Sequence, residues 1–315
     1  MPAYLASFAC RRLVGGLART LVGNIVAILI GHGSTVTMAH AGVALLADEP
    51  LRLGALTSSD LANGSCPGLA IESVSLSSSG KYVYRVRFAA NWQGSLTKVE
   101  IDPRTGNDVT ELWRAGDRLS SRLLIVPGVK DTPWLTERRI ASRDSTGKAV
   151  PFLWENLTLS QQDSLAPGKP ARGKAILEFL RGSRANEGTA VDRFRIRAGP
   201  LGDISNSRAV FVGAPNAPYL DRNDPGYSTF RNAYASRAGR VYVGANDGMM
   251  HAFDDATGDE TWAYVPLALY RPDSTGLGAL SYQDGALPPF RHHYYVDSTP
   301  RIADVDFGGG AWRSL

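Results

Sequence analysis

The most regular stretch of this sequence is Val241-Tyr-Val-Gly-Ala-Asn-Asp-Gly-Met-Met-His-Ala-Phe-Asp-Asp-Ala-Thr-Gly-Asp-Glu-Thr-Trp-Ala-Tyr-Val-Pro266. Its apolar runs at residues 241–243 and 249–253 have the length of short β-strands. Between them, Asn246-Asp-Gly248 contains residue types that tolerate a positive φ, as a tight hairpin turn requires. The pattern therefore predicts a β-hairpin, followed by a third strand at residues 262–265. We expect His251, inside the second strand, to be a packed or edge residue.

The same stretch carries a turn signature that occurs a second time. Asp254-Asp-Ala-Thr-Gly258 is followed by Trp262, and Asp102-Pro-Arg-Thr-Gly106 is followed by Trp113. In both turns the Asp and Thr side chains can bond to the backbone, and Gly supplies the positive φ. We expect the two tryptophans, with Phe253, to pack between neighbouring sheets, as the repeated blades of a propeller require.

Alternating apolar and polar residues predict further strands before this stretch. Residues 82–88 alternate with strand period, so that one face would carry the aromatic and apolar side chains and the other the arginines (Tyr82, Tyr84, Val86 and Phe88 against Arg85 and Arg87). In a second run at residues 96–101, Lys98 and Glu100 should face away from Val99 and Ile101. A short apolar run at residues 210–212 predicts another strand.

Helical signals are few and short. Residues 160–163 have the composition of a helix start, and residues 175–181 could form two turns before Gly182 ends them. The intervening residues 166–170 are rich in Pro and Gly and predict a loop. The fold class that follows is all-β with a few short helices, and the repeated turn favours a propeller over a sandwich or barrel.

The N-terminus has the features of a secretory signal peptide. Residues 1–41 contain no Asp or Glu and include a basic region (Arg11, Arg12 and Arg19). The apolar run at residues 21–30 is too short to span roughly 30 Å of hydrocarbon. Ala39-His-Ala41 then places small residues at the two positions that signal peptidase reads, so we expect cleavage before Gly42. Arg11-Arg12 also suggests twin-arginine export, but the surrounding residues fit that signal poorly.

Export would leave a nearly neutral chain that begins with a linker or arm at residues 42–68. Without the three leader arginines, 31 basic residues remain against 30 acidic ones, a net charge near +1. No basic stripe with interleaved aromatic residues is present, so nucleic acid is not an expected partner. Of the two cysteines, Cys10 lies in the leader and Cys66 remains, so we expect no intramolecular disulfide.

Residues 241–266 resemble the signature blade of the PilC/PilY family. Shorter matches to the family lie in order around them, at residues 177–182, 194–197, 201–207, 212–215, 293–297 and 311–314. The family has a short helix at the first of these and a strand at the second, Phe194-Arg-Ile-Arg197. The resemblance covers roughly residues 70–315 and implies a partial β-propeller of the PQQ/quinoprotein-like type.

The resemblance also implies an incomplete domain. Residues 69–315 would be the N-terminal part of the propeller, and the chain would stop at Leu315 within a strand. Family members are usually longer, often carry a von Willebrand A-like domain before the propeller, and have an Asp-rich calcium loop in later blades. We therefore expect calcium in the full-length family only, and no cofactor within this chain.

Patterns that could bind phosphate or metal are incomplete. Gly168-Lys-Pro-Ala-Arg-Gly-Lys-Ala175 lacks the Ser or Thr that holds magnesium in a phosphate-binding loop. His292 and His293 would point to opposite faces of a strand and could not chelate one ion. The aspartates near the chain end (Asp297, Asp304 and Asp306) and the loop at residues 221–226 offer fewer oxygens than calcium requires.

Signatures of catalysis are missing as well. The sequence contains no Gly-x-Ser-x-Gly elbow, no Cys–His signature and no His-Glu-x-x-His. Cys66, which precedes a proline, is expected to be incidental. We therefore expect no catalytic, cofactor-binding or metal-binding residues.

The function that the resemblance implies is an exported, non-catalytic scaffold of type IV pilus assembly, motility or adhesion. Its partners would be pilus subunits, pilus assembly proteins or a host surface. Its location would be the periplasm, the outer membrane surface or the pilus, with no integral membrane span after signal cleavage. One alternative is a fragment of a PQQ dehydrogenase, because quinoprotein blades share the Asp-x-x-Thr-Gly turn and the Trp. Another is a nonfunctional remnant, whose exposed sheet edges would favour aggregation.

Overall fold

The computed structural model describes residues 72–76, 80–89, 93–124, 132–283 and 289–314, all within one compact unit, Ala70–Leu315. The expected signal peptide, the expected linker and Cys66 lie outside the described residues. The strands are β1 (Glu72–Leu76), β2 (Tyr82–Ala89), β3 (Gln93–Ile101), β4 (Asp108–Arg114), β5 (Ile140–Arg143), β6 (Ala149–Pro151), β7 (Val210–Val212), β8 (Arg240–Ala245), β9 (Met249–Asp254), β10 (Glu260–Tyr264), β11 (Asp304–Asp306) and β12 (Trp312–Ser314). The helices are α3 (Ala115–Arg122), α4 (Pro133–Thr136), α5 (Leu159–Leu165), α6 (Pro170–Arg181) and α7 (Tyr227–Ala233), with 3-10 turns at Trp154–Asn156, Leu267–Leu269 and Leu277–Ser281.

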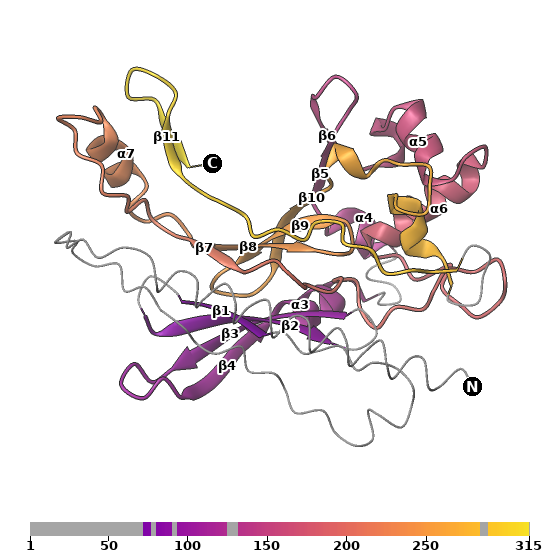
Figure 1. The fold of residues 1–315 in the computed structure, drawn as a ribbon, viewed down its shortest axis with the longest axis horizontal. Helices are drawn as coiled ribbons and strands as arrows, with labels where there is room; N and C mark the ends of the chain where they lie inside the picture. The colour runs from indigo at the N-terminus through magenta and orange to yellow at the C-terminus, as the bar shows by residue number, and fades with distance from the viewer. Residues whose placement is uncertain (1–71, 77–79, 90–92, 125–131, 284–288, 315) are drawn as a thin grey trace, which may run out of the picture. The chain divides into compact units, whose positions relative to one another are not determined.

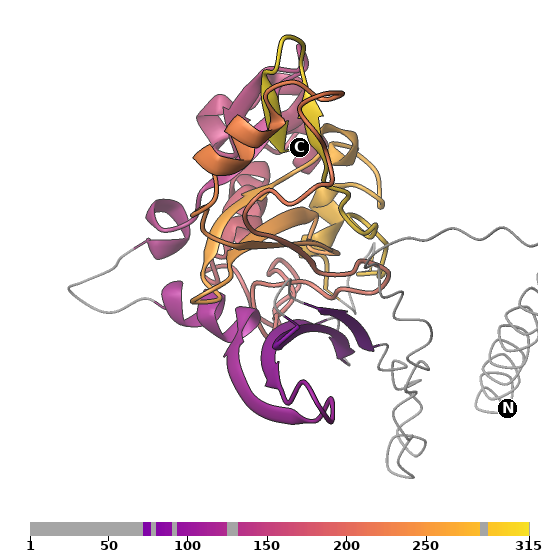
Figure 2. The same ribbon diagram turned by 90° about the vertical axis from the view of Figure 1, so that its left-hand side faces the viewer.

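Two four-stranded antiparallel meanders form the centre of this unit (Figure 1). The first sheet has the order β1-β2-β3-β4, and its strands twist strongly (Figure 2). The second sheet contains β7-β8-β9-β10, and β5 and β6 extend it beyond β10, where β5 runs parallel. In both meanders each strand pairs with its neighbour in sequence, so the two sheets have the same topology.

The strands form where alternating patterns predicted them. In β2, Tyr84 and Val86 are buried as expected. In β3, the alternation holds, but residues 96–99 are all buried, including Lys98. Both faces of β3 are therefore covered at residues 96–99, which the alternation alone does not predict.

The segment between β4 and β7 carries α3 to α6, β5 and β6, and part of it forms a second apolar core with residues of β9 and β10 and residues after β10. Phe152, Ile176, Phe179 and Phe194 lie in this core with Val265, which follows β10. α6 is longer than predicted because Pro170, whose fixed φ suits the first turn of a helix, starts it. Gly182 ends α6 with a φ of 121°, as predicted.

Two local predictions in this region require correction. α5 begins at Leu159, slightly before the predicted start, because Thr158 and Gln161 form a capping box. The predicted strand at residues 194–197 does not form, and Phe194 makes one isolated bridge with Glu187. Arg197 instead directs its guanidinium to Glu187 and to the carbonyls of Phe179 and Ser183, so its hydrogen bonds replace a strand ladder.

The C-terminal residues form the hairpin β11–β12, which lies beside α7 (Figure 2). Trp312 of β12 contacts the ring of Tyr227 in α7. The Tyr227 hydroxyl donates to Asp304 Oδ2 at 2.8 Å, and Asp304 and Asp306 lie within β11. Residues 289–297 contain no strand, so the expectation that His292 and His293 lie on one is wrong. No helix among the described residues is long and apolar enough to cross a membrane.

Candidate functional site at the joint between the sheets

The two Asp-x-x-Thr-Gly turns have the same structure and the same place in their sheets. Each joins the third strand to the fourth, β3 to β4 and β9 to β10. The Gly106 amide donates to the Asp102 carbonyl at 2.7 Å, and the Gly258 amide donates to the Asp254 carbonyl at 2.8 Å. Both glycines have a positive φ, 72° and 76°. The predicted repeat of the turn is therefore confirmed: each sheet carries it between the third and fourth strands of a four-stranded antiparallel meander.

Trp113, on β4, connects the first sheet to the turn of the second. Its indole Nε1 donates to the Asp255 carbonyl at 2.8 Å, and the residue is 4% exposed. A Cβ at Gly258 would lie 2.7 Å from the indole Cγ, a distance that carbon atoms do not reach without displacement. The prediction that Trp113 packs between sheets is thus confirmed, and the glycine of the turn is what allows the indole to approach.

Asp255 receives the polar side chains of the first sheet. The Tyr84 hydroxyl donates to Asp255 Oδ1 at 2.6 Å, and Lys98 Nζ donates to the same oxygen at 2.7 Å. Burial raises the pKa of the Tyr84 phenol, and its hydrogen bond to Asp255 adds to the effect. Since a buried ammonium group requires a partner, this carboxylate explains how Lys98 can be 5% exposed.

We call the contact of Trp113, Tyr84 and Lys98 with the turn of the second sheet the joint. Apolar side chains surround the polar groups of this joint. Tyr84 stacks on Phe211 with ring centroids 5.9 Å apart, and Phe253 is fully buried in the same cluster, as predicted. Trp262 behaves differently. Among the described residues its ring contact is with Tyr242 of the same sheet, and it remains partly exposed rather than lying between two sheets.

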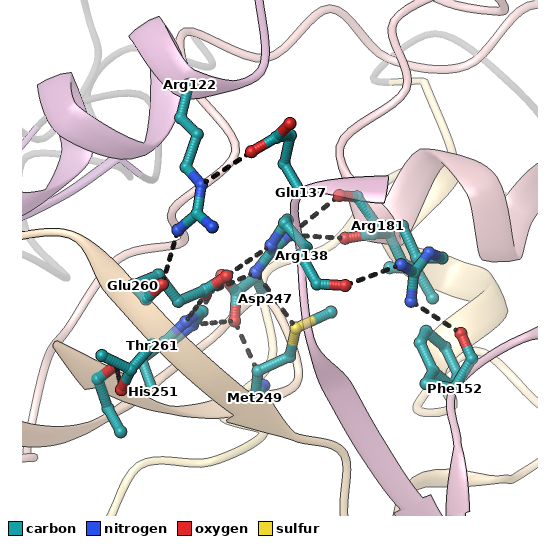
Figure 3. A network of polar contacts seen from close by, with 12 residues as sticks. Arg122, Glu137, Arg138, Phe152, Arg181, Asp247, Met249, His251, Glu260 and Thr261 are labelled. Atoms are coloured by element: carbon teal, nitrogen blue, oxygen red, sulfur yellow. Dashed lines mark hydrogen bonds and ion pairs between the residues drawn. The ribbon is translucent and has the colours of Figure 1, made fainter. Parts of the chain in front are cut away.

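A buried ion network ties the second sheet to the segment before β5 (Figure 3). Arg138 donates from both Nε and Nη2 to the Glu260 carboxylate, at 2.7 Å each, and both side chains are almost completely buried. Its Nη1 donates to the Arg181 carbonyl at the end of α6 at 3.0 Å. Two parallel bonds of this kind fix the orientation of a guanidinium and a carboxylate. Arg138 therefore joins β10, α6 and β5.

His251 stands between two carboxylates in this network. Its Nδ1 lies 2.8 Å from Glu260 Oε1, and its Nε2 lies 3.1 Å from Asp247 Oδ2. Burial alone would lower the pKa of His251, but Asp247 and Glu260 outweigh it and raise that pKa to about 9. Burial would also raise the pKa of both carboxyl groups, yet Arg138 and His251 hold it below its usual range. The imidazole is thus protonated and donates on both sides.

Sequence reasoning anticipated part of this network. Of the two alternatives for His251, a packed or an edge residue, the structure shows the packed one, and Asp247 lies in the predicted turn. No local pattern points to Arg138, because its partner Glu260 is 122 residues away. The Asp247-x-x-x-His251 spacing across the hairpin was an available signal, since the turn brings the two side chains to one side.

The network can hold elements together, but a substrate has little access to it. Its charged groups are paired with one another, and His251 and Arg138 are buried. The cavity that reaches Asp247, lined also by Gln93 and Gly202, has a volume of about 20 Å³, room for roughly one water. No group of three or more His, Cys, Asp or Glu that could hold a metal occurs within the described ranges.

The remaining site candidates of the sequence have structural roles. Pro170, inside the expected loop at residues 166–170, starts α6, and what precedes it is a helix and a loop instead of the strand of a phosphate-binding site. His292 lies 3.0 Å from Asp203, and Asp297 accepts from Asn206. Asp221, in the loop before α7, accepts from the Ser228 amide at 2.8 Å. These groups are dispersed over several elements, and the structure does not bring them together.

Comparison with known proteins adds a family to this geometry. Residues 201–315 match the family model described as the PilY1 beta-propeller domain. Type IV pilus biogenesis factor PilY1 of Pseudomonas aeruginosa strain PAK is 37% identical over 249 residues, which cover 75% of this chain and 20% of that protein. A Type IV pilus biogenesis factor PilY1 homolog of Xylella fastidiosa strain Temecula1 is 34% identical over 257 residues, 80% of this chain and 18% of that protein. No solved structure matches the chain.

The chain spans about a fifth of the length of the curated relatives it matches. The residues that match the family model include β7 to β10 and the turn between β9 and β10, a turn that the first sheet repeats. Residues 201–315 therefore form part of a PilY1 β-propeller domain, and three quarters of the chain is similar to type IV pilus biogenesis factors PilY1.

Proposed function

We propose that this chain is an exported, non-catalytic scaffold that supports type IV pilus assembly by docking other proteins. The observation that carries the proposal is the joint, in which Trp113 of the first sheet docks on the Asp254–Gly258 turn of the second. Relatives that share this part of the chain are named for type IV pilus biogenesis. Consecutive sheets held in this way form a rigid support for loops and edges, which suits protein–protein contacts.

The partners we propose are pilus subunits or pilus assembly proteins, with a host surface as a further candidate for adhesion or motility roles. The proposed location is the periplasm, the outer membrane surface or the pilus. Buried and mutually paired charges support a holding role, because they stabilise one arrangement of sheets and helices and present no reactive group to solvent. We also propose that the chain acts without a cofactor of its own.

The experiment is complementation in the bacterium that carries the gene. A strain without the gene should show fewer surface pili, measured in sheared fractions and by electron microscopy, and the wild-type gene should restore them. Trp113→Ala, which opens the joint, should restore them poorly. Val191→Ala changes an exposed loop residue and should restore them fully. Unchanged piliation after deletion would contradict the proposal.

A separate assay tests the non-catalytic part of the proposal. The purified chain is incubated with pyrroloquinoline quinone, calcium and a primary alcohol, and the reduction of an electron-accepting dye is followed. We expect no reduction above the rate without protein. Sustained turnover would instead support the quinoprotein alternative.

A further inference from the structure

Three stretches of backbone pack against one another where the first sheet meets the segment before β7. Gln93, at the start of β3, forms an isolated antiparallel bridge with Gly202. A Cβ at Gly94 would lie 2.0 Å from the Gly202 carbonyl oxygen, and a Cβ at Gly202 would lie 2.3 Å from the Asp247 amide nitrogen. The two glycines therefore allow the first sheet, Gly202 and the turn between β8 and β9 to pack with no side chain between them.

The carboxylate of Asp247 fixes this contact. Its Oδ2 accepts from the Gly202 amide at 2.9 Å, and its Oδ1 accepts from the Met249 amide at 3.1 Å. His251 Nε2 lies 3.1 Å from the same carboxylate, whose side chain is only 13% exposed. An amide that leaves a buried acceptor loses a hydrogen bond that water does not readily replace. The position of the Asp247 carboxylate therefore determines whether Gly202 stays bonded.

The other side of His251 leads to the end of α6 (Figure 3). Its Nδ1 is bonded to Glu260, and the Glu260 carboxylate holds the guanidinium of Arg138. Arg138 Nη1 in turn donates to the Arg181 carbonyl, and the last turn of α6 lines the small cavity beside Gly202. A continuous series of buried polar contacts thus joins the end of α6 to the place where the first sheet meets Gly202.

We propose that this series couples the end of α6 to the packing of the first sheet, because Arg138 and Glu260 hold His251 where Asp247 can keep the Gly202 amide bonded. When the Arg138 end is loosened, the imidazole shifts and the Gly202 contact opens locally while both sheets stay folded. Since coupling between two sites is reciprocal, displacing Gly202 also loosens the end of α6. A change at the helices is in this way transmitted to the first sheet. This inference does not depend on the role in pilus assembly.

Hydrogen exchange of the folded, isotope-labelled chain, followed by NMR, tests the proposal. Arg138→Lys keeps the positive charge but loses the two parallel bonds to Glu260. We expect the Gly202 amide to exchange at least about fivefold faster in this variant than in the wild type. The Gly106 and Gly258 amides close the two Asp-x-x-Thr-Gly turns outside the series, so they should keep their wild-type rates and exclude a general loosening.

Arg240→Lys is the matched control. Arg240 makes a 2.7 Å ion pair with Asp254 on the second sheet, outside the series. The same substitution there should leave the exchange rate of the Gly202 amide unchanged. A Gly202 amide that keeps its wild-type rate in Arg138→Lys, or that exchanges equally fast in Arg240→Lys, would overturn the proposal.

His251→Gln interrupts the series at its centre and leaves Arg138 and Glu260 in place. The Gly202 amide should again exchange faster, and the double variant with Arg138→Lys should exchange no faster than the faster single variant, because both changes act through one series. Effects that multiply in the double variant would show that the two residues act independently. Circular dichroism confirms that each variant is folded, and if Arg138→Lys does not fold, the comparison of His251→Gln with Arg240→Lys decides the proposal.

Discussion

Gly106 and Gly258 occupy the same position in two copies of one turn, and they differ in whether a side chain covers them. Both have a φ near 75°, a backbone conformation that costs an L-residue free energy. The Trp113 indole covers Gly258, whereas the space in front of Gly106 holds no described atom within 4 Å. Substituting each glycine in turn therefore distinguishes two losses of unfolding free energy. One comes from the backbone conformation alone, and the other from a side chain that displaces Trp113.

We predict that Gly258→Ala destabilises the chain more than Gly106→Ala. The alanine at 106 should cost about 1–2 kcal/mol of unfolding free energy for its positive φ. The alanine at 258 should cost about 1–3 kcal/mol more, because its Cβ overlaps with Trp113. Urea unfolding of both variants, followed by circular dichroism, measures the difference. Equal losses would mean that Trp113 does not dock on this turn.

The buried His251 makes stability depend on pH. Its pKa is raised to about 9 in the folded chain, against roughly 6.5 for an unfolded histidine. The folded state therefore binds the proton more tightly. The resulting stabilisation is fully present below about pH 6.5 and is lost as the pH rises to about 9.

We predict that the urea midpoint of the wild-type chain falls between about pH 6.5 and pH 9. His251→Gln should unfold more easily at pH 6 and should lose most of this slope, because the group that titrates is gone. Urea titrations of both proteins across this range give the comparison. The same slope in the two proteins would assign the pH dependence to other groups.

Single residues also show what the sequence could reveal. The alternation in β3 correctly placed Lys98 opposite to Val99, but a strand pattern does not tell which partner covers the polar face. The covering carboxylate, Asp255, is 157 residues away. In the same way, the sequence predicts His251 as a packed or edge residue, but it does not predict that Arg138, 122 residues from Glu260, completes its network.

At the scale of elements, local signals predicted strands and turns better than helices. The strands around the Asp-x-x-Thr-Gly turns form as expected, because side-chain period and turn chemistry act over a few residues. α3 and α7 were not predicted, and both are short helices stabilised mainly by packing, as weak helical patterns usually are. The strand expected at residues 194–197 failed because Arg197 is used to bind carbonyls and Glu187.

The fourth strands of the two sheets allow a direct comparison of two tryptophans. Trp113→Ala should cost about 3–5 kcal/mol of unfolding free energy, because the side chain is buried between the sheets and bonded to Asp255. Trp262→Ala should cost less, since part of that ring already faces water and its ring contact is with Tyr242. Thermal unfolding of both variants measures the two losses. A larger loss of unfolding free energy in Trp262→Ala than in Trp113→Ala would show that Trp113 is not the tryptophan that holds the sheets together.

For the whole molecule, the repeated turn was the signal that mattered most. It predicted that two sheets are copies, and the structure shows the same strand order and the same turn position in both. The sequence did not reveal that α5 and α6 share an apolar core with Val265 and Leu277, since no local pattern joins these distant segments. The family match and the sheet order agree on a propeller domain.

The central claim is that the two sheets face each other through Trp113 and the turn of the second sheet. A nuclear Overhauser spectrum of the isotope-labelled chain tests it, with the Trp113 indole proton assigned by its loss in Trp113→Phe. We predict strong cross-peaks from that indole to the Gly258 α-protons and to the Asp255 backbone. Cross-peaks confined to residues of the first sheet would show that the sheets do not stack, and would contradict the account.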